Sequence, residues 1–132
     1  MNELNKDIEP LFESDLKNLE LLGRGKVRDI YNIDDNHLLI VTSDRISAFD
    51  VILNNPIPGK GIALTSISNF WFDKLSEIVP NHLTNRNLNE INISASELEI
   101  IKDRAIIVKK LRPLPIESVV RGYLIGSGWK DY

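Results

Sequence analysis

Short apolar runs bounded by turn residues predict several β-strands. The first three cover residues 19–22, 27–33 and 37–42, and glycine or Asp-Asp-Asn turn signals separate them. A fourth strand, rich in isoleucine and valine, is predicted over 104–111. Because the first strands follow one another through short turns, the pattern predicts an antiparallel meander and not a βαβ unit.

One long segment has helical spacing. Thr65 or Ser66 is expected to cap this helix, and Pro80 is expected to stop it. Its apolar stripe is expected to face the core, because a 3.6-residue period alone explains it. The stripe consists of Ile67, Phe70, Trp71, Leu75, Ile78 and Val79. The fold class predicted from these elements is α+β, an antiparallel sheet with the helix packed on one face.

The remaining segments give weaker signals. Residues 1–18 are expected to form one or two short helical turns, and residues 43–50 and 54–61 are expected to be loops. Residues 81–95 are expected to be mostly loop with a short strand at 82–84, and Ser94 or Ser96 is expected to open one helical turn.

Composition narrows the class of protein. The chain has 132 residues, enough for one modest core, and a formal charge of −3 gives no electrostatic case for nucleic acid. Cysteine is absent, which excludes disulfides and thiolate metal sites, and two isolated histidines do not indicate zinc. The sequence shows no apolar signal core and no membrane-spanning run, so a cytoplasmic protein without a membrane partner is expected.

The segment 115–129 carries the densest candidate chemistry. A predicted buried strand ends at Arg121, and three glycines and Ser127 follow it within a few residues. An arginine presented to a glycine-rich turn suits a phosphate or a carboxylate. The alternative is a structural hairpin in which Arg121 pairs with Glu117.

A second glycine-rich turn, G-R-G-K-V-R-D at 23–29, lies between two predicted strands. It fits neither the Walker spacing nor the dinucleotide fingerprint, because it does not enter a helix and position 28 is arginine. A period of two places Lys26 and Arg28 on the same side of a strand. Such a hairpin either covers nucleotide phosphates as a flap or is a tight turn with two solvated cations.

Two further groups of charged residues are candidates. Strand alternation is expected to turn either Lys109 or Lys110 inward, where an anionic partner such as a phosphate would be needed; two exposed lysines at a strand end are the alternative. The loop 43–50 carries Asp44, Arg45, Ser47 and Asp50, which suit a polar substrate, a hydrated Mg²⁺ or only a self-capped turn.

Taken together, these segments resemble the SAICAR synthetase family, the phosphoribosylaminoimidazole-succinocarboxamide synthases of purine biosynthesis. The matching segments are 25–31, 43–50, 56–61, 68–75 and 108–132. The resemblance implies an enzyme that uses ATP and Mg²⁺ to join L-aspartate to a carboxylated aminoimidazole ribonucleotide through an acyl phosphate. It also implies a glycine-rich flap over a nucleotide cleft.

The resemblance assigns two groups of site residues. The first is expected to contact ATP, at its phosphates or along the nucleotide cleft, and comprises Gly25, Lys26, Val27, Arg28, Lys109 and Leu111. The second is expected to contact the other substrates and comprises Arg121, Ser127, Ser47, Asp50 and Glu117. Within it, Arg121 and Ser127 are expected to grip the phosphate of the ribonucleotide. The resemblance assigns no catalytic residue and no metal ligand within these 132 residues.

The chain departs from the family at Ile125, where a small residue or threonine is usual, and it lacks the later D-x-K-x-E-type segment with the Mg²⁺ carboxylates. It is therefore expected to be an N-terminal portion without turnover of its own, with an ATP-flap domain at 1–112 and the start of a substrate lobe at 113–132. Exposed apolar residues after 118 would favour oligomerisation or disorder. The macromolecular partner expected is a second copy or a complementing C-terminal fragment.

Two other functions fit less of the sequence. The first is a non-catalytic nucleotide-binding module that acts through a partner chain. The second is a kinase-like phosphotransferase, which shares a glycine-rich flap but would need H-R-D and D-F-G signatures that are absent here.

Overall fold

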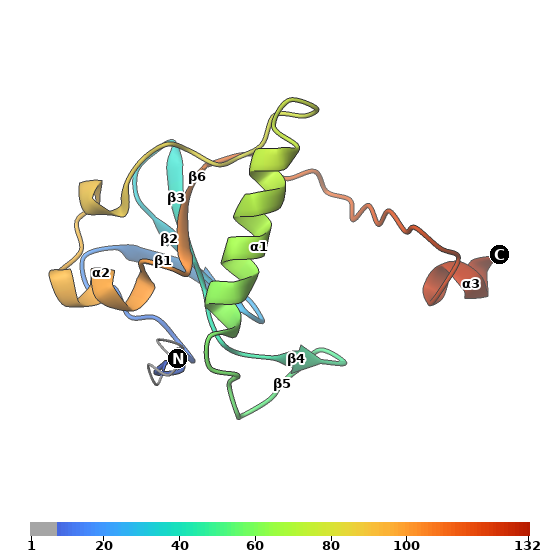
Figure 1. The fold of residues 1–132 in the computed structure, drawn as a ribbon, viewed down its shortest axis with the longest axis horizontal. Helices are drawn as coiled ribbons and strands as arrows, with labels where there is room; N and C mark the ends of the chain where they lie inside the picture. Colours follow the sequence, from blue (N-terminus) through green and yellow to red (C-terminus); the bar gives the residue numbers. More distant parts are fainter. Residues whose placement is uncertain (1–7) are drawn as a thin grey trace, which may run out of the picture.

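A computed structural model describes residues 8–132 and shows an antiparallel sheet with helices beside it (Figure 1). The sheet has the order β1-β2-β3-β6 and consists of β1 (Glu20–Arg24), β2 (Arg28–Asn32), β3 (His37–Thr42) and β6 (Ala105–Lys109). Each neighbouring pair is antiparallel. The predicted meander and the predicted α+β class with an antiparallel sheet are confirmed.

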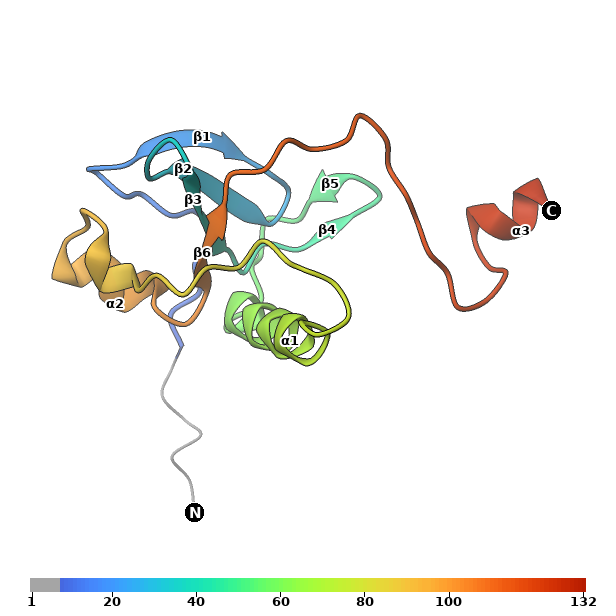
Figure 2. The same cartoon turned by 90° about the horizontal axis from the view of Figure 1, so that it is seen from above.

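The core lies on one face of the sheet. Tyr31, Leu39 and Ile107 come from three strands and are all buried, and Ile101 from α2 (Ala95–Ile101) packs against them. Since successive side chains of a strand point to opposite faces, their neighbours, such as Ile40, belong to the other face. That second face meets α1 (Lys60–Lys74), so the two helices cover opposite sides of the sheet (Figure 2).

Helix α2 begins as predicted. The Ser94 hydroxyl accepts a hydrogen bond from the Glu97 backbone N–H, and the Glu97 carboxylate accepts one from the Ser94 backbone N–H. This reciprocal capping box satisfies two backbone donors that the first turn leaves without helical partners. The expected strand at 82–84 is reduced to a single bridge between Leu83 and Val108, and the loop also contains the short 3₁₀ helix η1 (Leu88–Glu90).

Helix α1 begins earlier than predicted. It starts at Lys60 after Gly59, whose φ of 77° lies in the left-handed region, and not at Thr65 or Ser66. The glycines of 54–61 predict a loop, but Gly61 lies inside the helix because its backbone packs directly on β3. A Cβ at Gly61 would lie 2.3 Å from the Thr42 carbonyl oxygen.

The predicted apolar stripe is exposed, so the prediction that it faces the core is wrong. The helix also ends at Lys74 and not at Pro80, so Leu75, Ile78 and Val79 of the stripe lie in the turns after α1. Trp71 is 50% exposed, and the other five members of the stripe are exposed by 41% or more. The helix instead buries Gly61 and Thr65, small residues that allow close approach to the sheet. An exposed apolar face of this kind is typical of a surface that another part of a protein covers.

Two expected irregular segments also differ from prediction. The segment 43–50 contains β4 (Ser47–Ala48), which forms a small hairpin with β5 (Val51–Ile52). Residues 8–18 contain no helix, so the expected helical turns are absent there, and residues 1–7 lie outside the described range. The Leu11 and Ser14 backbone N–H groups donate to aspartate side chains and not to helical carbonyls.

The C-terminal segment leads away from the sheet. Residues 110–126 form no strand, so the expected buried strand before Arg121 is absent, and the chain ends in α3 (Ser127–Asp131) (Figures 1 and 2). The predicted apolar exposure is confirmed for Val119, Val120, Tyr123, Leu124 and Trp129. No helix among residues 8–132 has the length and apolar character needed to cross a membrane.

Candidate functional site

Asp44 follows β3 and is fully buried. Its carboxylate accepts hydrogen bonds from the Gly61 backbone N–H at 2.7 Å, the Arg104 guanidinium at 2.7 Å and the Leu11 backbone N–H at 2.8 Å. It therefore ties the start of α1, the residue that precedes β6 and the N-terminal segment to one point. The contacts that make burial of this charge tolerable are all internal to the fold.

Arg45 is also buried, and it anchors the β1–β2 turn. Its guanidinium donates to the Asp29 carboxylate at 2.8 Å and to the Gly25 carbonyl at 3.0 Å, and its Nε donates to the Lys26 carbonyl at 3.1 Å. A further hydrogen bond goes to the Phe12 carbonyl. Arg45 thus supports the β1–β2 turn and Asp44 supports the start of α1, and neither has a free charge to offer to a substrate or Mg²⁺.

Protonation of Asp44 is expected to weaken the fold at low pH. Burial alone would raise the pKa of Asp44, but the hydrogen bonds from Gly61, Arg104 and Leu11 outweigh it and hold the pKa below its ordinary value. A carboxyl whose folded pKa is lowered stabilises the protein fully above the unfolded value of about 3.9 and loses that contribution as the pH falls through the folded value. Urea unfolding from neutral pH down to about pH 3 should therefore show falling stability.

The matched variant for this experiment is Asp44→Asn, which removes the titrating group. It is expected to be less stable than the parent at neutral pH and to lose less stability on acidification. An unchanged slope against pH would contradict a contribution from Asp44.

The first candidate hollow, called the turn hollow, lies between the β1–β2 turn, the β4–β5 hairpin and the start of α1. Its volume is about 480 Å³, and it is lined by Lys26, Val27, Ile46, Ser47, Phe49, Asp50 and Lys60. The Lys26 ammonium donates to the Asp50 carboxylate at 2.5 Å, and this hydrogen bond and the Lys26 charge lower the pKa of Asp50. Partial burial is the main cause that lowers the pKa of Lys60.

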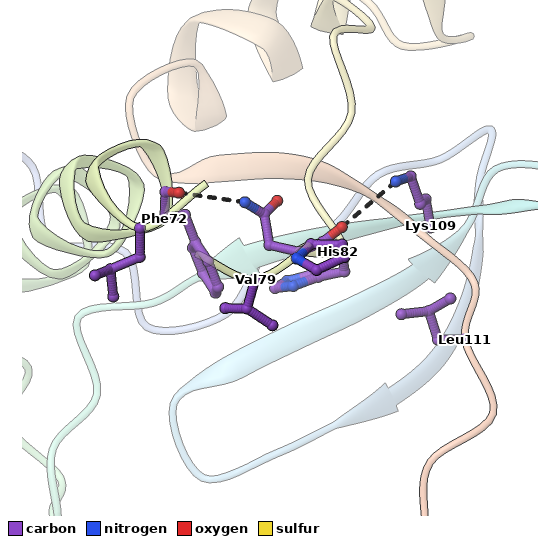
Figure 3. Close-up of a pocket in the computed structure, with 8 residues that line it drawn as sticks. Phe72, Val79, His82, Lys109 and Leu111 are labelled. Atoms are coloured by element: carbon purple, nitrogen blue, oxygen red, sulfur yellow. Dashed lines mark hydrogen bonds between the residues drawn. The ribbon is translucent and has the colours of Figure 1, made fainter. Parts of the chain in front are cut away.

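The second hollow, called the helix-end hollow, lies where the end of α1 approaches β6 (Figure 3). Its volume is about 540 Å³, and it is lined by Phe72, Leu75, Val79, Pro80, Asn81, His82, Lys109 and Leu111. Lys109 donates to the Asn81 carbonyl at 3.4 Å, and the Asn81 amide donates to the Phe72 carbonyl at 3.2 Å. Mostly apolar walls with a cation at the rim suit a flat organic ring that carries anionic groups.

A smaller cavity of about 180 Å³ between α1 and the sheet contains Arg28. It shares Phe72 and His82 with the helix-end hollow. Burial, together with the charges of Arg28 and Lys109, lowers the pKa of His82. Asn69 also lines the cavity, and its buried side-chain oxygen has no hydrogen-bond partner among residues 8–132.

The prediction that Lys26 and Arg28 share one side of a strand is wrong, and the structure decides between the two alternatives for Lys109 and Lys110. Lys26 lies in the turn before β2 begins and lines the turn hollow, whereas Arg28 lines the cavity beside α1, so the two do not share one side of a strand. Lys109 and Lys110 are both exposed, so neither is turned into the core. The alternative of two exposed lysines at a strand end is the one observed.

The predicted substrate residues are only partly brought together. Ser47 and Asp50 meet Lys26 and Val27 in the turn hollow. Arg121 donates to the Ser127 hydroxyl at 3.2 Å, so the alternative that pairs it with Glu117 is not observed. Glu117 is exposed on the segment that leads away from the sheet, and Ile125 is exposed as well.

Sequence reasoning missed Lys60, His82 and Asn69. Lys60 lies within P-I-P-G-K-G, one of the segments that carry the family resemblance, so its motif was a usable signal. His82 and Asn69 carry no local signal. Among residues 8–132, no three histidine, cysteine, aspartate or glutamate side chains gather in a way that would hold a metal ion. The described residues therefore do not fit Mg²⁺ by themselves.

The arrangement is that of an α+β lobe with candidate ligand hollows at the two ends of α1. A protein-family model of SAICAR synthetase matches residues 21–132. The chain belongs to the SAICAR synthetase family. The match includes every residue that lines the turn hollow and the helix-end hollow, together with Arg121 and Ser127.

Curated relatives agree with this assignment. The phosphoribosylaminoimidazole-succinocarboxamide synthase of Azoarcus sp. is 66% identical over 123 residues, which is 93% of this chain and 39% of that protein. The corresponding synthase of Nitrosomonas europaea is 61% identical over 122 residues, which is 92% of this chain and 41% of that protein. The chain thus spans about two fifths of the length of these relatives.

Solved structures show the same fold. A SAICAR synthase superposes with a TM-score of 0.83 at 44% identity, over 92% of this chain and 44% of that one. The SAICAR synthase of Saccharomyces cerevisiae complexed with SAICAR gives 0.80 at 42% identity, over 92% of this chain and 44% of that one. A type-2 SAICAR synthetase in complex with ADP gives 0.53 at 26% identity, over 70% and 34%.

Proposed function

We propose that this chain is the N-terminal portion of an ATP-dependent ligase that joins L-aspartate to carboxyaminoimidazole ribonucleotide and yields SAICAR, ADP and phosphate. The observation that carries the proposal is the family match over residues 21–132, which includes both hollows. The SAICAR-bound and ADP-bound relatives support a ribonucleotide and an adenine nucleotide as ligands. Residues 1–112 then form the ATP-flap domain, and residues 113–132 begin the substrate lobe.

ATP is proposed to lie in a cleft beneath the β1–β2 turn. The turn residues Gly25, Lys26, Val27 and Arg28 act as a flap that supplies backbone donors and two cations to the phosphates. The hydrogen bonds of Arg45 to the Gly25 and Lys26 carbonyls hold this turn in place before ATP arrives. Lys109 and Leu111 border the base-binding part of the cleft, where the apolar walls of the helix-end hollow suit an adenine ring.

The ribonucleotide is proposed to bind through Arg121 and Ser127. These side chains already contact each other, and both are exposed, so a phosphate can accept hydrogen bonds from the guanidinium and the hydroxyl together. Ser47, Asp50 and Glu117 complete the proposed substrate region. The carboxylates that hold Mg²⁺ are proposed to lie in the part of the relatives' length that this chain does not span.

Nucleotide binding tests the placement of ATP. Calorimetric titration of the chain with ATP and Mg²⁺ is expected to show binding, and Lys109→Gln is expected to weaken it about tenfold through loss of one charge-assisted hydrogen bond. Lys110→Gln is the matched control, because Lys110 is the next residue, bonds to the Asn32 side chain and does not line the helix-end hollow. Equal effects of the two substitutions would contradict the assigned cleft.

The chain alone is expected to show no synthetase turnover, because no described group of carboxylates fits Mg²⁺. The assay is succinocarboxamide formation by the pure chain, with and without a C-terminal fragment that supplies the remaining length. Turnover by the chain alone would contradict the proposal. ATP binding without turnover in the presence of the complementing fragment would favour a non-catalytic nucleotide-binding module.

A further inference from the structure

Strand β1 lies at one edge of the main sheet. It pairs with β2, and among residues 8–132 no other strand lies beside it. No backbone hydrogen bond within this range joins β1 to a segment other than β2, and all five of its residues are exposed. An edge of this kind presents a row of N–H and C=O groups that another strand can pair with.

The sequence of β1, E-L-L-G-R, is complementary to itself in the antiparallel orientation. Pairing about a two-fold axis at Leu22 places Glu20 opposite Arg24 of the second copy, and the symmetry repeats this contact on the other side of the axis. Opposite charges directly across an antiparallel pair attract each other. A shift by one residue in either direction would place Glu20 opposite a glycine, so the charges favour the centred register.

Both charged groups are able to form this contact. Among the described residues, Glu20 forms no ion pair and no side-chain hydrogen bond. Arg24 is held near the edge by a hydrogen bond to the Ser14 carbonyl at 2.8 Å, and its Nε lies 3.5 Å from the Glu13 carboxylate. Its side chain stays 36% exposed. A guanidinium has five N–H donors, so Arg24 can keep these contacts and also donate to a carboxylate of the second copy.

A bulge at Leu22 also favours a second copy as the partner. The register with β2 shifts between Leu21 and Gly23, so Leu22 is the extra residue of β1. A bulge twists an edge strand and hinders its pairing with a regular strand. The two-fold axis places the two bulges opposite each other, so both strands carry the same distortion at the same point. Leu21 and Leu22, which are 37% and 49% exposed, would then be partly covered.

We propose that β1 is the edge at which two copies of this chain join their main sheets into one continuous antiparallel sheet. The contacts between Glu20 and Arg24 fix the register, and the backbone groups of the edge supply the hydrogen bonds. Because β1 leads directly into the β1–β2 turn, the second copy also restrains the turn that is proposed to cover ATP. Dimerisation through β1 does not depend on the proposed function.

Sedimentation-velocity ultracentrifugation of the chain tests this edge. The parent is expected to show a concentration-dependent equilibrium between monomer and dimer. Glu20→Arg and Arg24→Glu each place like charges opposite each other at both contacts, so each should weaken the dimer about tenfold or more. An equimolar mixture of the two variants should restore the dimer, because every contact then joins an arginine to a glutamate. Such a rescue would also show that both variants keep the fold of β1.

Glu77→Arg is the matched control, because Glu77 is exposed in the turn after α1 and the substitution changes the net charge as Glu20→Arg does. It should leave the dimer unchanged. Trp71→Gln alters the exposed apolar face of α1 and should also leave the dimer unchanged. Loss of the dimer in Trp71→Gln but not in Glu20→Arg would overturn β1 as the interface. A parent that stays monomeric at millimolar concentration, or a mixture without rescue, would overturn the proposal as well.

Discussion

Replacement of Arg45 by methionine is expected to lower the free energy of unfolding by about 3–5 kcal/mol, the cost of leaving one member of a buried ion pair alone. The methionine keeps much of the volume but removes the guanidinium donors to Asp29, Gly25 and Lys26, so that Asp29 keeps only its hydrogen bonds from the Ser14 N–H and hydroxyl. Arg24 lies 3.8 Å from the Asp29 carboxylate and is partly exposed, so it does not replace the direct contact. A loss of this size is a large part of the total stability of a small domain, about 5–15 kcal/mol.

Chemical denaturation measures the effect, and Lys102→Met is the matched control. Lys102 forms an ion pair with Glu99 at 2.6 Å, but 46% and 72% of the two side chains are exposed. Exposed pairs contribute about 0–1 kcal/mol, so the control should remain close to the parent. Similar losses in the two variants would show that the burial of Arg45 is not what makes its ion pair important. The β1–β2 turn should also become mobile in Arg45→Met, which hydrogen exchange at the Gly25 and Lys26 amides would detect.

Replacement of Gly61 by alanine is expected to destabilise the chain by about 1–3 kcal/mol, the range for overpacking at a filled site. This expected loss of stability is opposite in sign to the usual effect of the substitution. Exchange of glycine for alanine inside a helix normally stabilises a protein by about 1 kcal/mol. At Gly61 the new Cβ would lie 2.3 Å from the Thr42 carbonyl oxygen and 3.1 Å from that of Ser43. Backbone atoms cannot move aside as a flexible side chain does, so the clash outweighs the helical propensity.

Gly122→Ala provides the comparison for Gly61→Ala. A Cβ at Gly122 would have no neighbour within 4 Å. Its stability should remain within about 0.5 kcal/mol of the parent, as for other surface substitutions. Thermal or urea unfolding of the two variants gives the measurement. A Gly61→Ala chain as stable as the parent would mean that α1 does not press on β3 at this point, and a shifted helix start would then be needed to explain it.

Local sequence signals were sufficient for the sheet and for α2. Turn residues separated the strands, and the spacing of Ser94 and Glu97 encoded a cap that forms between near neighbours. The start of α1 was not predictable in this way, because Gly61 gives the same local signal in a loop and at a tight packing point. The distinction depends on Thr42, which is distant in the sequence and adjacent only in the folded chain.

The exposure of the predicted apolar stripe also could not be predicted from local sequence. Helical periodicity shows that Phe70 and Trp71 belong to one apolar face, but it does not show what covers that face. In this chain, which spans about two fifths of its relatives' length, the face is open to solvent. The predicted strand at 82–84 likewise depends on a distant partner. It is reduced to one bridge between Leu83 and Val108 of β6.

The sequence by itself determined the four strands of the main sheet, the capped helix α2 and the family, because these depend on residues close together in the chain or on motifs in a set order. Only the tertiary structure decided the roles of the charged residues in S-D-R-I-S-A-F-D. Asp44 and Arg45 are buried supports, whereas Ser47 and Asp50 line a hollow with Lys26 and Lys60. The sequence does not distinguish an aspartate that supports the fold from one that lines a hollow. The role of its carboxylate depends on the donors that the fold brings within hydrogen-bonding distance.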